Sequence, residues 1–171
     1  MAWIRRRPIG APVGSLRRSD MRAIRIFRSR LDADGSVKPH DDPAILADTF
    51  IIRHINPDYH VCFDENLGSD RIGGNAFSAT NRDPHYGMSV DIGQLLAEAG
   101  LPECHIVPPG MGAVRLPVGS VRALSLKLGS DPIVPSNQYH GQVWGVKNSK
   151  RKKLQQIVVG WVVELPGVAL R

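Results

Sequence analysis

Phe50-Ile51-Ile52-Arg53-His54-Ile55 is the stretch of this sequence that decides the fold. Its β-branched, apolar composition is that of a largely buried strand, yet it carries Arg53 and His54. Burying an unpaired guanidinium costs several kcal/mol, so Arg53 is expected to meet a carboxylate, backbone carbonyls, water or an anionic ligand. A structural ion pair, an edge-strand arginine in solvent and an anion-binding site all fit this pattern.

The composition is that of an ordinary globular domain. The chain has 171 residues, of which 42% are hydrophobic and 22% are charged, and no apolar run approaches the roughly 18 residues of a membrane span. Two cysteines, Cys62 and Cys104, are too few for a disulfide scaffold, and the basic start lacks the apolar segment of a secretory signal. We therefore expect a cytoplasmic protein without membrane contact. An arginine-rich start also suits an organelle transit peptide, with translation beginning at Met21.

Two short segments hold the excess positive charge behind the net charge of +6. Residues 1–30 contain nine arginines against one acid, and residues 147–153 add five cations without an acid. The first segment is interrupted by prolines and glycines, which predicts a flexible arm that binds phosphate backbones through counterion release. The anion-binding residues expected in the two segments are Arg5, Arg6, Arg7, Lys150, Arg151, Lys152 and Lys153. Nucleic acid or another polyanion is the partner this implies, and solvated surface charge is the alternative.

Further strands and short helices are predicted from periodicity and from cap residues. Asp42 and Pro43 favour a helix over 44–48, and Asp91 with Gln94 resembles the capped start of a helix over 92–99. The strands we expect, besides the first, span residues 59–63, 88–91, 111–116, 121–128 and 139–146, with a polar loop at 64–74. Residues 150–163 suit either a helix or a strand.

These elements predict a single α+β domain over residues 40–165, with a mixed or antiparallel sheet and two or three short helices. A basic N-terminal arm over 1–39 and a tail over 166–171 would flank it.

Common enzyme signatures do not occur in this sequence. Gly73-Gly74 allows positive φ angles and a close ligand approach, but the segment through Ser78 is not a dinucleotide-binding fingerprint. Phosphate-binding loop, zinc-protease and serine-hydrolase motifs are missing as well. His60-x-Cys62 and Cys104-His105 offer zinc-ligand types without the spacing of a zinc finger, so no metal is predicted.

The order of four polar motifs along this chain resembles that in the RES-domain proteins, which are NAD-consuming bacterial toxins with an ADP-ribosyltransferase-like fold. It comprises Arg53 on a strand, Gly73-Gly74-Asn75 through Ser78, a helix ending in Glu98, and Val134-Pro135-Ser136. The resemblance covers residues 50–146 and implies Arg53, Glu98 and Ser136 as the family's arginine, acid and serine. The family's aromatic-Asn step is replaced here by Asn75-Ala76-Phe77, a departure that bears on NAD binding. The chain resembles a family of small bacterial proteins to a comparable degree, and that resemblance implies no activity.

The sequence thus predicts a domain that binds a phosphate-bearing ligand. In the enzyme version, which cleaves NAD or transfers ADP-ribose with NAD as the substrate, Arg53 holds phosphate and Glu98 stabilises the developing oxocarbenium. Ser78 or Ser136 would orient the ribose. The ordinary interpretation of Glu98 is the exposed face of a helix. The alternative function is a non-catalytic nucleic-acid-binding or protein-interaction module that uses the basic arm and the cluster at 147–153.

Overall fold

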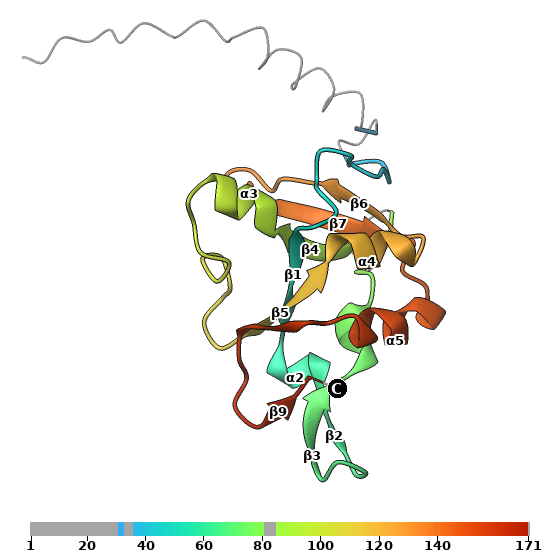
Figure 1. The fold of residues 1–171 in the computed structure, drawn as a ribbon, viewed down its shortest axis with the longest axis vertical. Helices are drawn as coiled ribbons and strands as arrows, with labels where there is room; N and C mark the ends of the chain where they lie inside the picture. The colour runs from blue at the N-terminus through green and yellow to red at the C-terminus, as the bar shows by residue number, and fades with distance from the viewer. Residues whose placement is uncertain (1–30, 33–35, 81–84, 171) are drawn as a thin grey trace, which may run out of the picture.

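A computed structural model describes residues 31–32, 36–80 and 85–170, and it confirms an α+β domain (Figure 1). The main sheet has six antiparallel strands in the order β6-β7-β4-β1-β5-β8. Their bounds are β1 Phe50–Ile55, β4 Met88–Ile92, β5 Gly112–Pro117, β6 Lys127–Ser130, β7 His140–Trp144 and β8 Gly160–Val163.

Strand β1 has different pairings on its two edges. It pairs with β5 along its whole length, from Phe50 opposite Pro117 to Ile55 opposite Gly112. With β4 it makes only two pairs, and the last joins Ile52 to Asp91. The sheet is therefore continuous on the β5 side and opens on the β4 side beyond Ile52.

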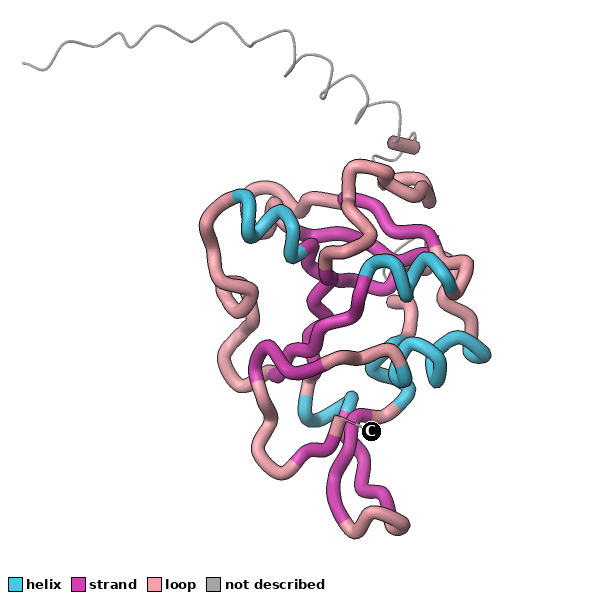
Figure 2. The backbone as a smooth tube through the Cα atoms, in the orientation of Figure 1, coloured by secondary structure: helices cyan, strands magenta, loops and turns pink. Residues whose placement is uncertain are grey.

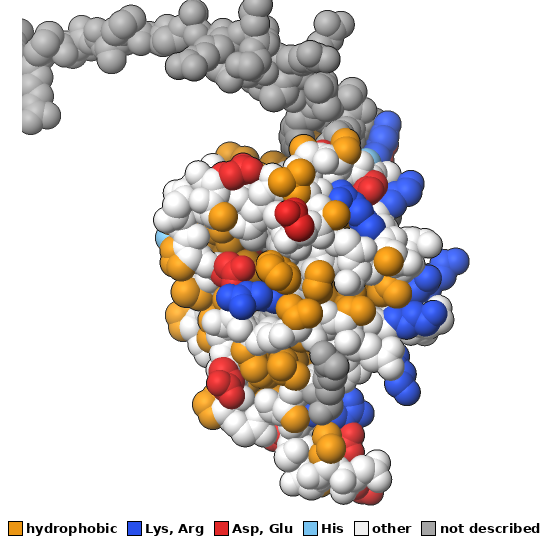
Figure 3. Space-filling view, in the orientation of Figure 1, with side chains coloured by type: hydrophobic (Ala, Val, Ile, Leu, Met, Phe, Trp, Pro, Cys, Tyr) orange, Lys and Arg blue, Asp and Glu red, His pale blue; other side chains and the backbone are white. Residues whose placement is uncertain are grey.

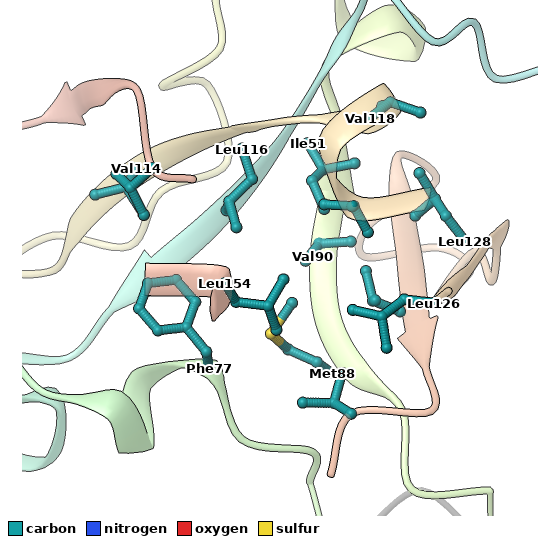
Figure 4. Packing of buried hydrophobic residues seen from close by; sticks show 14 of the residues in the cluster. Ile51, Phe77, Met88, Val90, Val114, Leu116, Val118, Leu126, Leu128 and Leu154 are labelled. Carbon is teal, nitrogen blue, oxygen red and sulfur yellow. The ribbon is translucent and has the colours of Figure 1, made fainter. Parts of the chain in front are cut away.

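Three helical segments contribute to the main core on one face of the sheet. These are η1 (Gly74–Phe77), α4 (Val118–Ala123) and α5 (Asn148–Gln156). Figure 4 shows Phe77, Leu154 and Val118 of these segments beside side chains from the strands. Leu154 is the buried residue of α5, and Ile157 and Val158, at i+3 and i+4 from it, reach the same core just after the helix ends at Gln156.

The opposite face carries a smaller apolar cluster near helix α3 (Gly93–Glu98). Ile52, Leu96 and Ala113 are its fully buried members, and side chains from 101–107 pack against them. Helix α2 (Pro57–His60) follows β1 directly, with the Asn56 side chain accepting a hydrogen bond from the backbone N–H of Asp58.

A second sheet of three strands lies at one end of the domain (Figure 2). It consists of β2 (Val61–Asp64), β3 (Ser69–Ile72) and β9 (Val168–Ala169). The loop expected at 64–74 is thus partly strand, because β2 and β3 pair as an antiparallel hairpin, and an ion pair between Arg71 and Asp64 links the two strands. Strand β9 pairs with β3, so residues 166–170 belong to the fold and are not a separate tail.

Several expected elements differ from the structure. Residues 44–48 form turns, in which the Asp42 carboxylate accepts from the N–H of Ala44 without starting a helix. The strand expected at 121–128 divides into α4 and β6, because Ser125 turns the chain with a positive φ. Residues 150–163 contain both a helix and a strand, α5 and β8.

The boundary expected between residues 39 and 40 is also displaced. Val37 is buried and the backbone N–H of Asp42 donates to Leu128, so the domain includes residues before 40. The arm predicted for residues 1–30 lies outside the described residues. In the described part of the chain, no helix is long and apolar enough to cross a membrane.

Candidate functional site in the split of the sheet

Arg53 occupies the place where β1 and β4 part. Its Nε donates to the carbonyl oxygen of Ala76 in η1 at 2.7 Å, and its Nη1 donates to the backbone oxygen of Ser89 in β4 at 2.7 Å. No carboxylate within the described residues forms an ion pair with it, and its third nitrogen, Nη2, makes no hydrogen bond there. Burial lowers the pKa of Arg53 to about 10, while the charge of Asp91 acts in the opposite direction. The side chain therefore stays charged near neutral pH.

Strand β4 presents polar residues beside this arginine because its side chains alternate. Met88, Val90 and Ile92 lie in the main core, which places Ser89 and Asp91 on the other face. On β7, Gln142 lies opposite Ser89 and His140 lies opposite Asp91, so these four residues share one face of the sheet.

Ser89 and His140 form a directed hydrogen-bond chain with Asp131. The Nδ1 of His140 lies 2.6 Å from the backbone oxygen of Asp131, which can only accept, so Nδ1 carries the proton. In the neutral ring Nε2 is then an acceptor, and it lies 2.8 Å from the Oγ of Ser89. Ser89 consequently donates its hydroxyl proton to His140. The Asp131 carboxylate is 3.7 Å from Nδ1 and accepts from Gln142 at 3.0 Å.

A second polar group surrounds Asp91, whose exposed fraction is 2%. Asn137 donates to its Oδ1 at 2.8 Å, and the Nε2 of His54 lies 2.8 Å from its Oδ2. The His54 contact has the distance of an ion pair but not the alignment of a hydrogen bond. Asp91 was expected to cap α3; instead the strand continues to Ile92, and Asp91 turns to partners on other elements.

Arg53, Ser89, Asp131, His140 and Gln142 line a cleft of about 930 Å³, whereas His54, Asp91 and Asn137 line a smaller cavity. This smaller cavity, of about 300 Å³, adjoins the cleft and shares Arg53, Ser89 and His140. Within the described residues, Arg53 is the cleft's cation and Asp131 is its carboxylate. The other polar side chains of the lining are Ser36, Asn56, Tyr59, His60, Asn75, Ser78, Thr80, Ser89, His140 and Gln142.

His60 is held neutral in the wall of the cleft. Burial, followed by the charge of Arg53, lowers the pKa of His60 to about 4. Its Nδ1 accepts a hydrogen bond from the backbone N–H of Asn56 at 3.0 Å, which also requires that nitrogen to be unprotonated.

The structure brings together only part of the expected catalytic set. Arg53 and Ser78 both line the cleft. Glu98 is exposed on α3, where its carboxylate accepts from Gln94 at 2.8 Å, and it does not line the cleft. Ser136 is exposed as well, and its hydroxyl donates to the backbone oxygen of Ile133. Glu98 faces outward because the core side of α3 is taken by Leu96.

The residues of the expected anion-binding cluster differ in how exposed they are. Lys152 and Lys153 are exposed on α5, and Figure 3 shows Lys and Arg side chains along the edge where this helix lies. Lys150 instead donates to the backbone oxygen of Leu124 at 2.8 Å, and Arg151 is half-buried. Arg5, Arg6 and Arg7 lie outside the described residues.

Sequence reasoning missed Ser89, His140 and Asp131. Residues 88–91 were expected to form a strand, but strand pairing brings Ser89 to a partner, His140, that is 51 residues away. Among the described residues, no three His, Cys, Asp or Glu side chains lie close enough together to hold a metal ion.

Comparison of this chain with protein families, with curated proteins and with solved structures finds no match.

Proposed function

We propose that the cleft binds a small phosphate-bearing ligand and that Arg53 is its principal anion contact. The observation that carries this proposal is the buried guanidinium with two neutral backbone acceptors and one unused nitrogen beside a cavity. A desolvated cation without a paired carboxylate is stabilised by an anion, and guanidinium groups match phosphate oxygens well. The negative charge of Asp91 acts on Arg53 without direct contact, because the two carboxylate oxygens of Asp91 face Asn137 and His54.

The rest of the lining suits the non-phosphate part of such a ligand. A volume of about 930 Å³ falls within the range of roughly 300–1,000 Å³ for small-molecule sites. Ser78 contributes a hydroxyl and Asn56 and Asn75 contribute amide groups to the lining, and these complement the hydroxyls of a sugar. A nucleotide is therefore the ligand class that we favour.

NAD cleavage is the enzymatic form of this proposal, following the resemblance to RES-domain proteins. It requires a carboxylate near the ribose to stabilise the oxocarbenium. Asp131 takes the place expected for Glu98, because it is the described carboxylate that lines the cleft. Release of nicotinamide from NAD would distinguish cleavage from binding alone.

Thermal unfolding with added ligands tests the binding proposal. The full-length protein is melted with pyrophosphate, ADP or NAD, and with adenosine as the phosphate-free control. A phosphate-bearing ligand at 100 times its Kd should add about 2.7 kcal/mol of stability, whereas adenosine should add less. Arg53→Gln should remove the shift, and Arg115→Gln, a matched strand arginine paired with Glu103 outside the cleft, should retain it.

Ser78→Ala keeps the test valid if Arg53→Gln fails to fold. Ser78 lines the cleft, and Arg53 is held by Ala76 and Ser89 and not by the Ser78 side chain. Ser78→Ala should weaken the shift without unfolding the protein. Equal shifts with adenosine and ADP, or no shift with any phosphate compound, would contradict the proposal.

A second function, binding of nucleic acid, is favoured by the exposed cations of α5. Lys147, Lys152 and Lys153 are exposed and no acid lies in the first turn of the helix. We propose weak, sequence-independent binding of phosphate backbones by this surface. Affinity for a labelled oligonucleotide, measured across salt concentrations, should fall steeply as the salt concentration rises.

Charge reversal tests whether nucleic acid binds to the α5 surface or responds only to the total charge of the protein. Lys152→Glu with Lys153→Glu should reduce the slope of log affinity against log salt by about 2. The control pair, Lys38→Glu with Lys127→Glu, changes the net charge equally at exposed sites that are not part of α5. Equal losses in the two pairs would remove α5 as the binding surface.

A further inference from the structure

We propose that Ser89 is a nucleophile, that His140 is its general base, and that the cleft acts on a carboxylic ester. This goes beyond ligand binding by Arg53, since it depends on the hydrogen bond between Ser89 and His140, which the binding proposal does not use. The two proposals can fail separately.

The direction of the hydrogen bonds carries the proposal. A serine hydroxyl is a weak nucleophile until an adjacent base accepts its proton. Here the carbonyl of Asp131 fixes the proton of His140 on Nδ1, which leaves Nε2 free to accept from Ser89 at 2.8 Å. A serine, a base and a group that orients the base are therefore arranged in space in the order that nucleophilic catalysis requires.

The surroundings supply the remaining requirements. The exposed fraction of His140 is 5%, so its ring is fixed by packing, while Ser89 is half-buried and lines both adjoining cavities. When His140 takes the proton, the Asp131 carboxylate at 3.7 Å stabilises the resulting positive charge. Arg53 donates to the backbone of Ser89 and lines both cavities with it, so we expect its guanidinium to stabilise the ester oxygen that becomes negative.

The reaction balances without a further reagent. The Oγ of Ser89 forms a bond to the acyl carbon of the ester, and its proton moves to the Nε2 of His140. The alcohol then leaves with the electrons of the broken C–O bond and takes that proton. Water hydrolyses the acyl-serine by the same route, with His140 accepting a proton from the water and returning it to Ser89.

A fluorophosphonate probe tests the nucleophile directly. Ser89 would attack phosphorus, fluoride would leave, and the serine proton would pass to His140. Mass spectrometry of the full-length protein should locate one adduct on Ser89. Ser89→Ala should abolish the adduct, and Ser149→Ala, at an exposed serine of α5, should leave the labelling rate unchanged.

His140→Gln should slow labelling by at least about 100-fold, because it removes the base. p-Nitrophenyl acetate gives an independent measurement on the unaltered protein. It should release a burst of about one equivalent of p-nitrophenolate, and Ser89→Ala should eliminate that burst. If His140→Gln does not fold, the wild-type adduct and the burst decide the question.

Two results would overturn the proposal. One is a folded wild-type protein that acquires no adduct at Ser89 and shows no burst. The other is an adduct on a different serine that persists in Ser89→Ala. Retention of ADP binding by Ser89→Ala would show that the ligand site survives independently of the nucleophile.

Discussion

On one side of β4, Met88, Val90 and Ile92 pack into the main core, whereas on the other side Ser89 and Asp91 meet histidines, amides and a cleft. The two sides belong to the same five residues, so a single strand positions both. Burial on the apolar side fixes the backbone, and that backbone determines where the polar side chains point. The stability of the fold and the geometry of the candidate site are therefore linked through β4.

The largest effect should come from the apolar side. Met88→Ala removes a fully buried side chain and should lower the free energy of unfolding by about 2–5 kcal/mol in urea denaturation. Ser89→Ala, one residue away, should change it by about 1 kcal/mol or less while abolishing probe labelling. Equal destabilisation by both substitutions would mean that the Ser89–His140 bond is structural.

Arg53 connects the two sides, and its loss should have the next largest effect on stability. Arg53→Leu leaves the carbonyls of Ala76 and Ser89 without this donor and should cost about 2–4 kcal/mol. The control Arg115→Leu breaks a partly exposed pair with Glu103 and should cost about 1 kcal/mol or less. Comparable losses in urea denaturation would contradict the assigned role of Arg53.

Asp91 should have a smaller effect. Asp91→Asn keeps an acceptor for Asn137 but removes the charge beside His54, and it should cost about 1–2 kcal/mol. Asp70→Asn, an exposed position on β3, is the control and should be close to neutral. If the two variants unfold at the same urea concentration, the Asp91 contacts do not stabilise the fold.

His60 should give the smallest effect, visible only through pH. Its pKa is about 4 in the folded state and 6.5 in the unfolded chain, so the unfolded chain binds the proton first as pH falls. The stability that neutral His60 contributes is complete above pH 6.5 and is lost as pH decreases towards about 4. His60→Gln should flatten this part of the stability curve, and His105→Gln, at an exposed histidine, should not. An unchanged curve in His60→Gln would show that His60 titrates normally.

The comparison between the two sides of β4 also explains what could be predicted from the sequence. Phe50–Ile55 and Met88–Ile92 carry clear strand patterns, because burying alternate side chains is a local requirement. Asp91 was assigned to a helix cap because Gln94 follows at the spacing of a capping box. Its actual partners, His54 and Asn137, are brought to it by strand pairing, which local spacing does not encode.

The candidate site was predictable in one respect. A charged residue in an apolar strand indicated that Arg53 has a special environment, and the structure places it in the cleft. Ser78 lines the cleft with it, whereas Glu98 and Ser136 were chosen from a resemblance in order along the chain. Order does not determine which face of a helix is exposed, and Glu98 faces outward because Leu96 fills the core side of α3.

The bridge that Arg53 makes between Ala76 and Ser89 has a consequence for genetics. A position that joins segments of the backbone and that, as we propose, also contacts a ligand cannot vary in one role without the other. In a library of random substitutions, selection for protein abundance and selection for activity should both reject changes at position 53. At Ser78 or Ser89 only selection for activity should do so, and the difference between the two selections would outline the cleft without any knowledge of its ligand.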